Sequence, residues 1–196
     1  IDTLMLQLPI ARATDTLQRL GLRRRNYVAA TLHRPSNVDD PTALAAVLDG
    51  LALVAESLPV VLPLHPRTVK NIERFHLGAK LTPLTVLEPL GYTEMLALTD
   101  SAQCVLTDSG GIQEETTALG VPCVTLREQT ERPITISQGT NHMAPWPLTP
   151  RGILGAYADS VAAVAKATPP RPAGWDGHAS ERIVKALEKH RPMKHY

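Results

Sequence analysis

The turn Ser109-Gly110-Gly111 lies between an apolar run and a stretch with helical character. The apolar run is Cys104 to Thr107, and Asp108 separates it from the turn. Consecutive glycines let a ligand approach the backbone closely, and the free amides of a first helical turn point toward it with the positive end of the helix dipole. The pattern indicates an anion-binding junction, for which a phosphate is the natural ligand. The same residues also suit an ordinary capped helix packed closely on a sheet.

Polar residues also follow the other apolar runs of the chain. They form four loops: His33-Arg34-Pro35-Ser36-Asn37, His65-Pro66-Arg67-Thr68, Glu88-Pro89, and Arg127 to Arg132. In an open parallel sheet, ligands bind outside the carboxyl ends of the strands, so these loops would meet the glycine pair at one edge. Histidines, arginines and backbone amides at one edge suit a phosphorylated ligand.

Among these side chains, His33 is the candidate for proton transfer, because an imidazole exchanges protons near neutral pH. It could donate to a phosphate oxygen or assist a leaving group. His65 and Arg67 could equally cap a helix or pair with a carboxylate, as loop charges commonly do. The histidines lack the i, i+4 spacing and the cysteine neighbours typical of zinc sites, so we expect no metal.

The elements that must position these residues can be read from the hydrophobic pattern. Expected strands cover Tyr27–Leu32, Val60–Leu64, Thr85–Glu88, Cys104–Thr107 and Pro122–Leu126. Expected helices cover Pro41–Ser57, Val69–Phe75, Tyr92–Thr99, Ile112–Leu119, about 150–167 and about 180–190. Alternating strands and helices, with strands apolar on both faces, predict an α/β fold with a doubly wound, Rossmann-like parallel sheet. Pro169, Pro170 and Pro172 would end the penultimate helix and carry the last one to another surface.

Length and composition narrow the classes of protein. The chain has 196 residues, enough for one large domain, and 20 Lys and Arg against 19 Asp and Glu give a net charge of +1. This balance predicts neither nucleic-acid nor membrane binding. Cys104 and Cys123 lie in apolar runs and suit reduced, packed thiols. With no apolar stretch of about 18 residues and no signal peptide, we expect a soluble, cytoplasmic protein. Because it opens at Ile1 without Met, we expect a fragment or a processed product.

Three motifs carry a family resemblance. They are His33-Arg34-Pro35-Ser36-Asn37, then Thr107-Asp108-Ser109-Gly110-Gly111-Ile112-Gln113-Glu114-Glu115, then Arg127-Glu128-Gln129-Thr130-Glu131-Arg132-Pro133 with Gly139-Thr140-Asn141. Their order and spacing resemble the C-terminal half of non-hydrolysing UDP-N-acetylglucosamine 2-epimerases, and the likeness extends to the ending Asp176 to Ile183. Ser36, Met95 and Ile134 depart from residues that many members carry.

The resemblance implies one half of a GT-B-like architecture of two Rossmann-like domains, with a UDP-sugar between them. Residues 1–196 would form a single nucleotide-binding domain, and the N-terminal domain would be absent. Carried over by motif, Ser109, Gly110 and Gly111 would hold the diphosphate, and Glu115 would accept from the ribose hydroxyls. The resemblance further places His33, as a catalytic residue, and Arg34 and Arg132 near the diphosphate and sugar, with the uracil near Leu90 and Met95.

The implied reaction eliminates UDP from the sugar and adds it back after C2 has inverted, a step in making cell-envelope polysaccharides. It needs no metal or redox cofactor, and its acid and base carboxylates belong to the N-terminal domain. The fragment would then be inactive alone, and the full-length enzyme would be a homodimer. Three alternatives stay open at this point: a UDP-sugar-binding module without chemistry, the nucleotide domain of a GT-B glycosyltransferase, and a purely structural α/β domain.

Overall fold

The computed structural model describes residues 1–167 and 171–189. Within them, six strands form one parallel sheet in the order β3-β2-β1-β4-β5-β6. The strands are β1 Val28–Thr31, β2 Val60–Pro63, β3 Thr85–Leu87, β4 Cys104–Thr107, β5 Cys123–Thr125 and β6 Asn141–Met143. The chain builds outward from β1 to β3 and then returns to place β4 beside β1. The carboxyl ends of β1 and β4 therefore flank the topological switch point, where open α/β sheets bind ligands.

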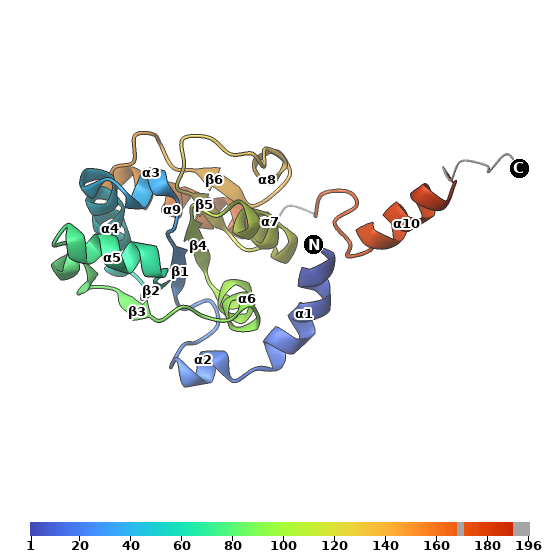
Figure 1. Cartoon of the computed structure of the whole chain (residues 1–196), viewed down its shortest axis with the longest axis horizontal. Coiled ribbons are helices and arrows are strands. Elements are labelled where there is room, and N and C mark those ends of the chain that lie inside the picture. The colour runs from blue at the N-terminus through green and yellow to red at the C-terminus, as the bar shows by residue number, and fades with distance from the viewer. Residues whose placement is uncertain (168–170, 190–196) are drawn as a thin grey trace, which may run out of the picture.

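Helices cover both faces of the sheet (Figure 1). One face packs against α4 (Pro41–Ala55), α5 (Pro66–Arg74) and α9 (Pro150–Lys166) over a core that includes Leu48 and Ile153. The other packs against α6 (Tyr92–Ser101) and α7 (Gly110–Leu119), with α1 (Asp2–Ala13) lying against α6. This covering explains why the central strands are apolar on both faces, and it confirms the predicted doubly wound fold class.

All five predicted strands and all six predicted helices are present, with ends that differ by at most three residues. Two of the differences lie at helix starts: α5 begins at Pro66 rather than Val69, and α7 at Gly110 rather than Ile112. At both starts the preceding residue caps the helix, so the first turn is set by polar side chains and not by apolar periodicity. Of the proline joint, Pro169 and Pro170 lie outside the described residues, as does residue 190.

Several elements were not predicted. They are α1, β6 and the short elements α2 (Thr16–Arg19), α3 (Pro35–Val38), α8 (Ile134–Ser137) and the 3-10 helix Gly78–Leu81. Helix α1 contains Pro9, which argues against a helix by local preference, yet Leu4, Leu8 and Ala11 are buried against α6 and α7. Tertiary burial of one apolar face therefore outweighs the local cost of the proline.

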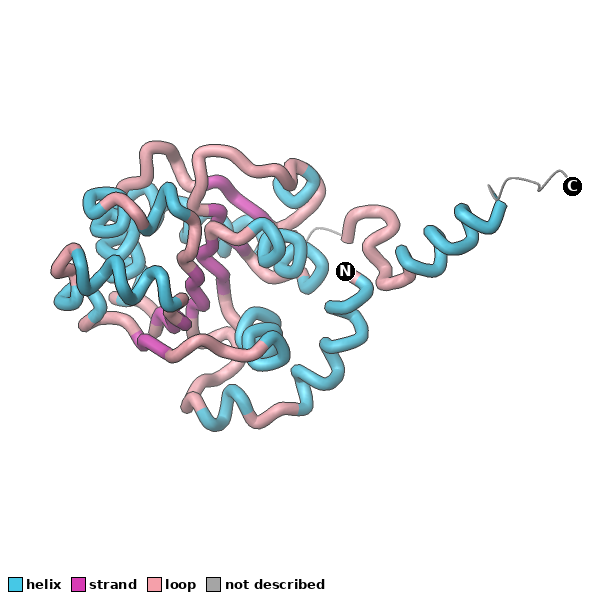
Figure 2. Tube along the Cα trace, in the orientation of Figure 1, coloured by secondary structure: helices cyan, strands magenta, loops and turns pink. Residues whose placement is uncertain are grey.

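The last described helix, α10 (Ala179–Lys189), extends from the body beside the start of α1 (Figure 2). Its first turn is tied to α1, because Asp2 accepts hydrogen bonds from the backbone amides of Ala179 (3.1 Å) and Ser180 (2.7 Å). None of the helices in the described ranges combines the length and the apolar character needed to cross a membrane.

Candidate functional site

A buried carboxylate, Asp108, organises the switch point. It follows β4 directly, is fully buried, and accepts hydrogen bonds from the backbone amides of His33 (3.1 Å) and Arg34 (2.9 Å) and from Asn37 Nδ2 (3.2 Å). Asn37 also donates to the carbonyl of Leu126, at 2.8 Å, at the end of β5. The carboxylate therefore fixes the loop after β1 against the carboxyl ends of β4 and β5.

The same carboxylate orients the imidazole of His33. Nδ1 of His33 lies 2.8 Å from Oδ1 of Asp108, and the His33 side chain is 41% exposed. An ionised carboxylate can only accept, so Nδ1 carries the shared proton and Nε2 is left for a ligand. Sequence reasoning placed Asp108 in the polar turn after β4 and in the family motif, but it assigned Asp108 no role of its own.

The anion-binding junction expected from sequence is formed by the start of α7. Ser109 is the N-cap, and its hydroxyl accepts from the Ile112 amide at 3.5 Å, a long contact that holds the hydroxyl weakly. A Cβ built on Gly110 would have no neighbour closer than 3.9 Å, and the same is true of Gly111. Because neither residue has a positive φ, packing and backbone conformation do not require glycine at either position. The bare backbone instead leaves room for a ligand.

Arginines gather around this helix start. Arg34 follows His33 and has a buried Nε without a hydrogen-bond partner in the described part of the chain. Arg132 forms an ion pair with Glu114 of α7 at 2.8 Å, and Arg127 forms a bidentate pair with Glu131 at 2.8 and 2.7 Å. Sequence reasoning assigned ligand roles to Arg34 and Arg132 and placed Arg127 in the same polar loop without a role.

The loop that carries Arg127 and Arg132 is anchored on α7, which is itself held to β6. Thr130 donates to the buried Gln113 side chain at 2.6 Å, and its hydroxyl also accepts from the Arg132 amide at 3.0 Å. Asn141 of β6 donates to the Gln113 carbonyl (2.9 Å) and to Thr117 (3.1 Å). The buried polar residues of the family motifs therefore hold the loop in place, a role that sequence spacing alone did not show.

The predicted ribose and base residues lie on α6, α7 and the loop before α6. Glu115 is partly buried and accepts a 3.3 Å hydrogen bond from the hydroxyl of Tyr92. Burial raises the pKa of Glu115. The pKa of Tyr92 is raised to about 12, because its hydroxyl is partly buried and lies beside the Glu115 carboxylate. Leu90 and Met95 are partly buried and pack in one apolar cluster with Ile112 of α7. The structure thus brings an apolar surface and a carboxylate to the same side of α7.

The loop after β2 holds two residues, His65 and Arg67, whose roles the sequence left open, and both contact other residues of the protein. His65 is the N-cap of α5 and accepts from the Arg67 amide at 3.2 Å, while Arg67 pairs with Asp39. The capping and pairing alternative therefore accounts for both residues. Across the described ranges, no group of three or more His, Cys, Asp or Glu side chains is arranged to hold a metal ion.

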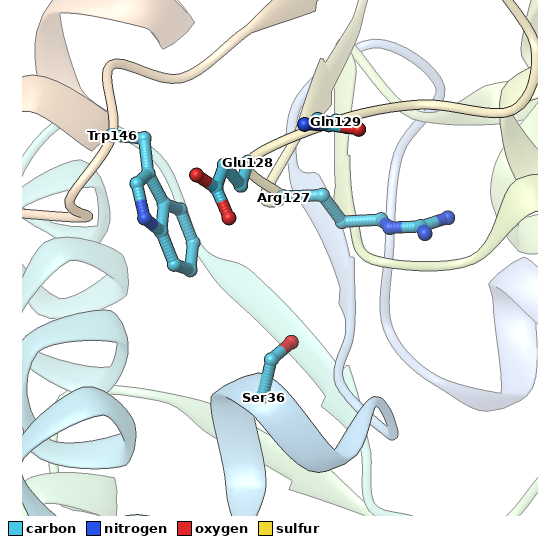
Figure 3. Close-up of a pocket in the computed structure, with 5 residues that line it drawn as sticks. All are labelled: Ser36, Arg127, Glu128, Gln129 and Trp146. Atoms are coloured by element: carbon cyan, nitrogen blue, oxygen red, sulfur yellow. The ribbon is translucent and has the colours of Figure 1, made fainter.

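A cavity of about 300 Å³ opens beside the arginine loop (Figure 3). It is lined by Ser36, Arg127, Glu128, Gln129 and Trp146. Figure 3 shows the Glu128 carboxylate directed toward the Trp146 ring, while the Arg127 side chain runs away from both. Trp146, which follows β6, was not predicted as a site residue because β6 itself was not recognised.

Fold and site together define a doubly wound α/β protein with a cationic, glycine-containing helix start at its switch point. The family model described as UDP-N-acetylglucosamine 2-epimerase matches residues 1–188, and the chain belongs to this family.

Relatives and solved structures agree with this assignment. The chain is 42% identical over 121 residues to UDP-N-acetylglucosamine 2-epimerase of Methanocaldococcus jannaschii, covering 59% of this chain and 33% of that protein. It is 39% identical to UDP-2,3-diacetamido-2,3-dideoxy-D-glucuronate 2-epimerase of Pseudomonas aeruginosa, covering 91% and 48%. The crystal structure of the Methanocaldococcus jannaschii enzyme in complex with UDP-GlcNAc and UDP superposes with a TM-score of 0.83 at 33% identity, covering 96% of this chain and 52% of that one. The chain thus spans about half the length, or less, of these relatives.

Proposed function

We propose that this chain is the nucleotide-binding half of a UDP-N-acetylglucosamine 2-epimerase, which interconverts UDP-N-acetylglucosamine and UDP-N-acetylmannosamine. Family membership and the likeness to an enzyme crystallised with UDP-GlcNAc and UDP support this assignment. In the proposal, a second Rossmann-like domain supplies the acid and base carboxylates and closes over the sugar. The chain alone then binds UDP but does not turn over substrate.

The observation that carries the proposal is the start of α7. Gly110 and Gly111 have space for a side chain that the fold would tolerate, so their bare amides are best explained by close approach of a diphosphate. Ser109 adds a hydroxyl that its weak capping bond leaves available, and Arg34 and Arg132 add positive charge. These groups together neutralise the two phosphates of UDP.

The remaining named residues fit the other parts of UDP. Glu115 accepts from the ribose hydroxyls, since a carboxylate is an acceptor for paired donors, and Tyr92 keeps its carboxylate oriented. The apolar cluster that holds Leu90 and Met95 receives the uracil, and the Met95 sulfur packs against the ring. This order, base then ribose then diphosphate, follows α6 and α7 toward the switch point.

In the proposed reaction, a base in the other domain removes the C2 proton, the bond between C1 and the phosphate oxygen breaks, and UDP leaves with the electron pair. The unsaturated 2-acetamido sugar then accepts a proton on its opposite face and UDP at C1. Negative charge grows on the departing phosphate, and the preorganised amides and arginines stabilise it. With both ring nitrogens protonated, His33 donates Nδ1–H to Asp108 and Nε2–H to that phosphate.

The Pseudomonas aeruginosa relative favours a second candidate substrate. It matches 91% of this chain, and its name identifies a UDP-sugar with acetamido groups at C2 and C3 and a carboxylate at C6. Both substrates share UDP and the C2 acetamido group, so the same half-site serves either. Parallel assays with the two UDP-sugars distinguish them.

The enzyme assembled with its second domain provides the test. We expect incubation with UDP-N-acetylglucosamine in D₂O to yield UDP-N-acetylmannosamine, with solvent deuterium at C2 detected by NMR. A glycosyltransferase would instead release UDP only when an acceptor is added, and a binding module would do neither. We further propose a homodimer in the cytoplasm; the free, buried thiols of Cys104 and Cys123 agree with a reducing compartment.

A further inference from the structure

Glu131 places a carboxylate where the proposed diphosphate would bind. One of its oxygens, Oε2, lies 3.9 Å from the position of a Cβ on Gly110, at the start of α7. The same oxygen accepts from Arg127 Nη1 at 2.8 Å, and Oε1 accepts from Nη2 at 2.7 Å. Glu131 therefore occupies both Nη atoms of Arg127, the pair of donors that a phosphate would use.

The negative charge of Glu131 makes its carboxylate resemble a bound phosphate. The pKa of Glu131 is lowered to about 2, chiefly by the hydrogen bonds from Arg127 and to a smaller extent by the positive charge of the nearby Arg34. Glu131 is therefore a full negative charge at every physiological pH. It is held by cations of the site and lies beside the helix terminus that favours anions.

We infer that Glu131 is an internal competitor of the diphosphate: it occupies Arg127 beside the α7 terminus, and it swings away when a UDP-sugar binds, which frees Arg127 for the phosphates. This inference rests on the proposed function and adds a self-blocking contact to the same site. A ligand with two phosphates displaces Glu131 from Arg127, whereas an anion that binds more weakly does not.

The exchange needs only a side-chain rotation. The backbone of the loop is anchored on either side of Glu131, by Thr130 to Gln113 at 2.6 Å and by Arg132 to Glu114 at 2.8 Å. The Glu131 side chain itself is 56% exposed. Releasing it therefore leaves the anchors and the position of Arg132 unchanged.

Glu128 is a matched control in the same loop. It is exposed and carries the same charge, but it lies next to Trp146, and Arg127 is directed away from it (Figure 3). Glu128→Gln and Glu131→Gln change the net charge equally. Only the second removes the partner of Arg127.

The test is calorimetric titration of the wild-type chain and both variants with UDP, and with uridine, which has no phosphate. We expect Glu131→Gln to bind UDP about threefold to tenfold tighter, because an exposed ion pair and a like-charge repulsion are both removed. Glu128→Gln should change UDP affinity by less than about twofold, and uridine affinity should not change in either variant.

Unchanged or weaker UDP binding by Glu131→Gln overturns the inference, and so does an equal gain in Glu128→Gln, which would reflect net charge alone. If the wild type binds UDP and Glu131→Gln does not improve it, the inference fails while the proposed function stands. If no form binds UDP, both fail. Glu131 is exposed, so its replacement by Gln is compatible with folding, which circular dichroism checks.

Discussion

Replacing Asp108 by Asn tests the clamp at the switch point. In the wild type, the buried carboxylate accepts from two backbone amides, from Asn37 and from His33. Asn keeps one oxygen but presents an NH₂ group to donors, so one or more buried donors lose their acceptor. An unsatisfied buried donor costs about 1–3 kcal/mol, and the loss of a buried charged partner about 3–5 kcal/mol.

We therefore expect Asp108→Asn to lower the free energy of unfolding by about 3–5 kcal/mol, measured by urea denaturation. We also expect UDP affinity to fall about tenfold or more, because His33 and Arg34 lose their fixed positions while Nδ1 of His33 loses its acceptor. Titration under conditions where circular dichroism shows a folded variant separates the two effects.

Asp100 supplies a matched control at the opposite end of β4. Its side chain is 2% exposed and pairs with Arg12 (2.8 Å) and Arg24 (3.0 Å), both far from the proposed ligand groups. Asp100→Asn should also destabilise, by about 2–4 kcal/mol, but UDP affinity should not change. Stability lost without loss of affinity in Asp108→Asn would refute the positioning role, and equal loss of affinity in both variants would refute the location of the site.

Three further variants test separate parts of the account. Gly111→Ala should stabilise the chain by about 0.5–1 kcal/mol, because a Cβ fits at this position and Ala favours a helix. The same variant should bind UDP more weakly, because the Cβ occupies space that the diphosphate would use. Thermal melting measures the first effect and titration the second, and unimpaired binding would contradict the diphosphate assignment. Glu115→Gln should raise the free energy of unfolding at pH 7, because burial raises the pKa of Glu115 and its ionised form therefore opposes folding. The gain in stability should vanish at pH values low enough to protonate Glu115 in both the folded and the unfolded chain. A gain that stays constant with pH in urea denaturation would show that burial of the charge is not its cause. Gly139→Ala should destabilise by about 1–3 kcal/mol, because a Cβ would lie 2.3 Å from the Thr135 carbonyl oxygen; a neutral effect in urea denaturation would mean that the loop moves freely.

The fold was largely predictable because its signals are local. Strand β4 was predicted with its observed ends, Cys104 and Thr107, because a strand covered on both faces is continuously apolar. Helix α7 was recognised with its observed end, Leu119, and the following Gly120 has a positive φ of 69°, as glycines after helices commonly do. By contrast, β6 has three residues, of which Asn141 is buried through polar contacts, so hydrophobic pattern gave no indication of it.

The places of the site residues in the fold could be predicted from the sequence, but the hydrogen bonds between them could not. Ser109, Gly110 and Gly111 lie at a helix start as expected, because strand, turn and cap are adjacent in sequence. The Asp108 clamp joins residues 74 and 75 positions apart, and its hydrogen bonds follow from the return of β4 beside β1. Contacts of this kind depend on the sheet order, which the alternation of elements does not specify.

Binding of UDP at the start of α7 is tested by titrating the chain with UDP and repeating the titration on Ser109→Ala, Glu115→Ala and Thr149→Ala. Thr149 caps α9 through a 3.1 Å bond to Gly152 and has no proposed ligand contact, so its variant controls for the loss of a helix cap. We expect the wild type to bind UDP, Ser109→Ala and Glu115→Ala each to bind it about tenfold more weakly, and Thr149→Ala to bind it as the wild type does. A folded wild type that does not bind UDP, or Ser109 and Glu115 variants that bind it as well as the wild type, would show that UDP does not bind at the start of α7.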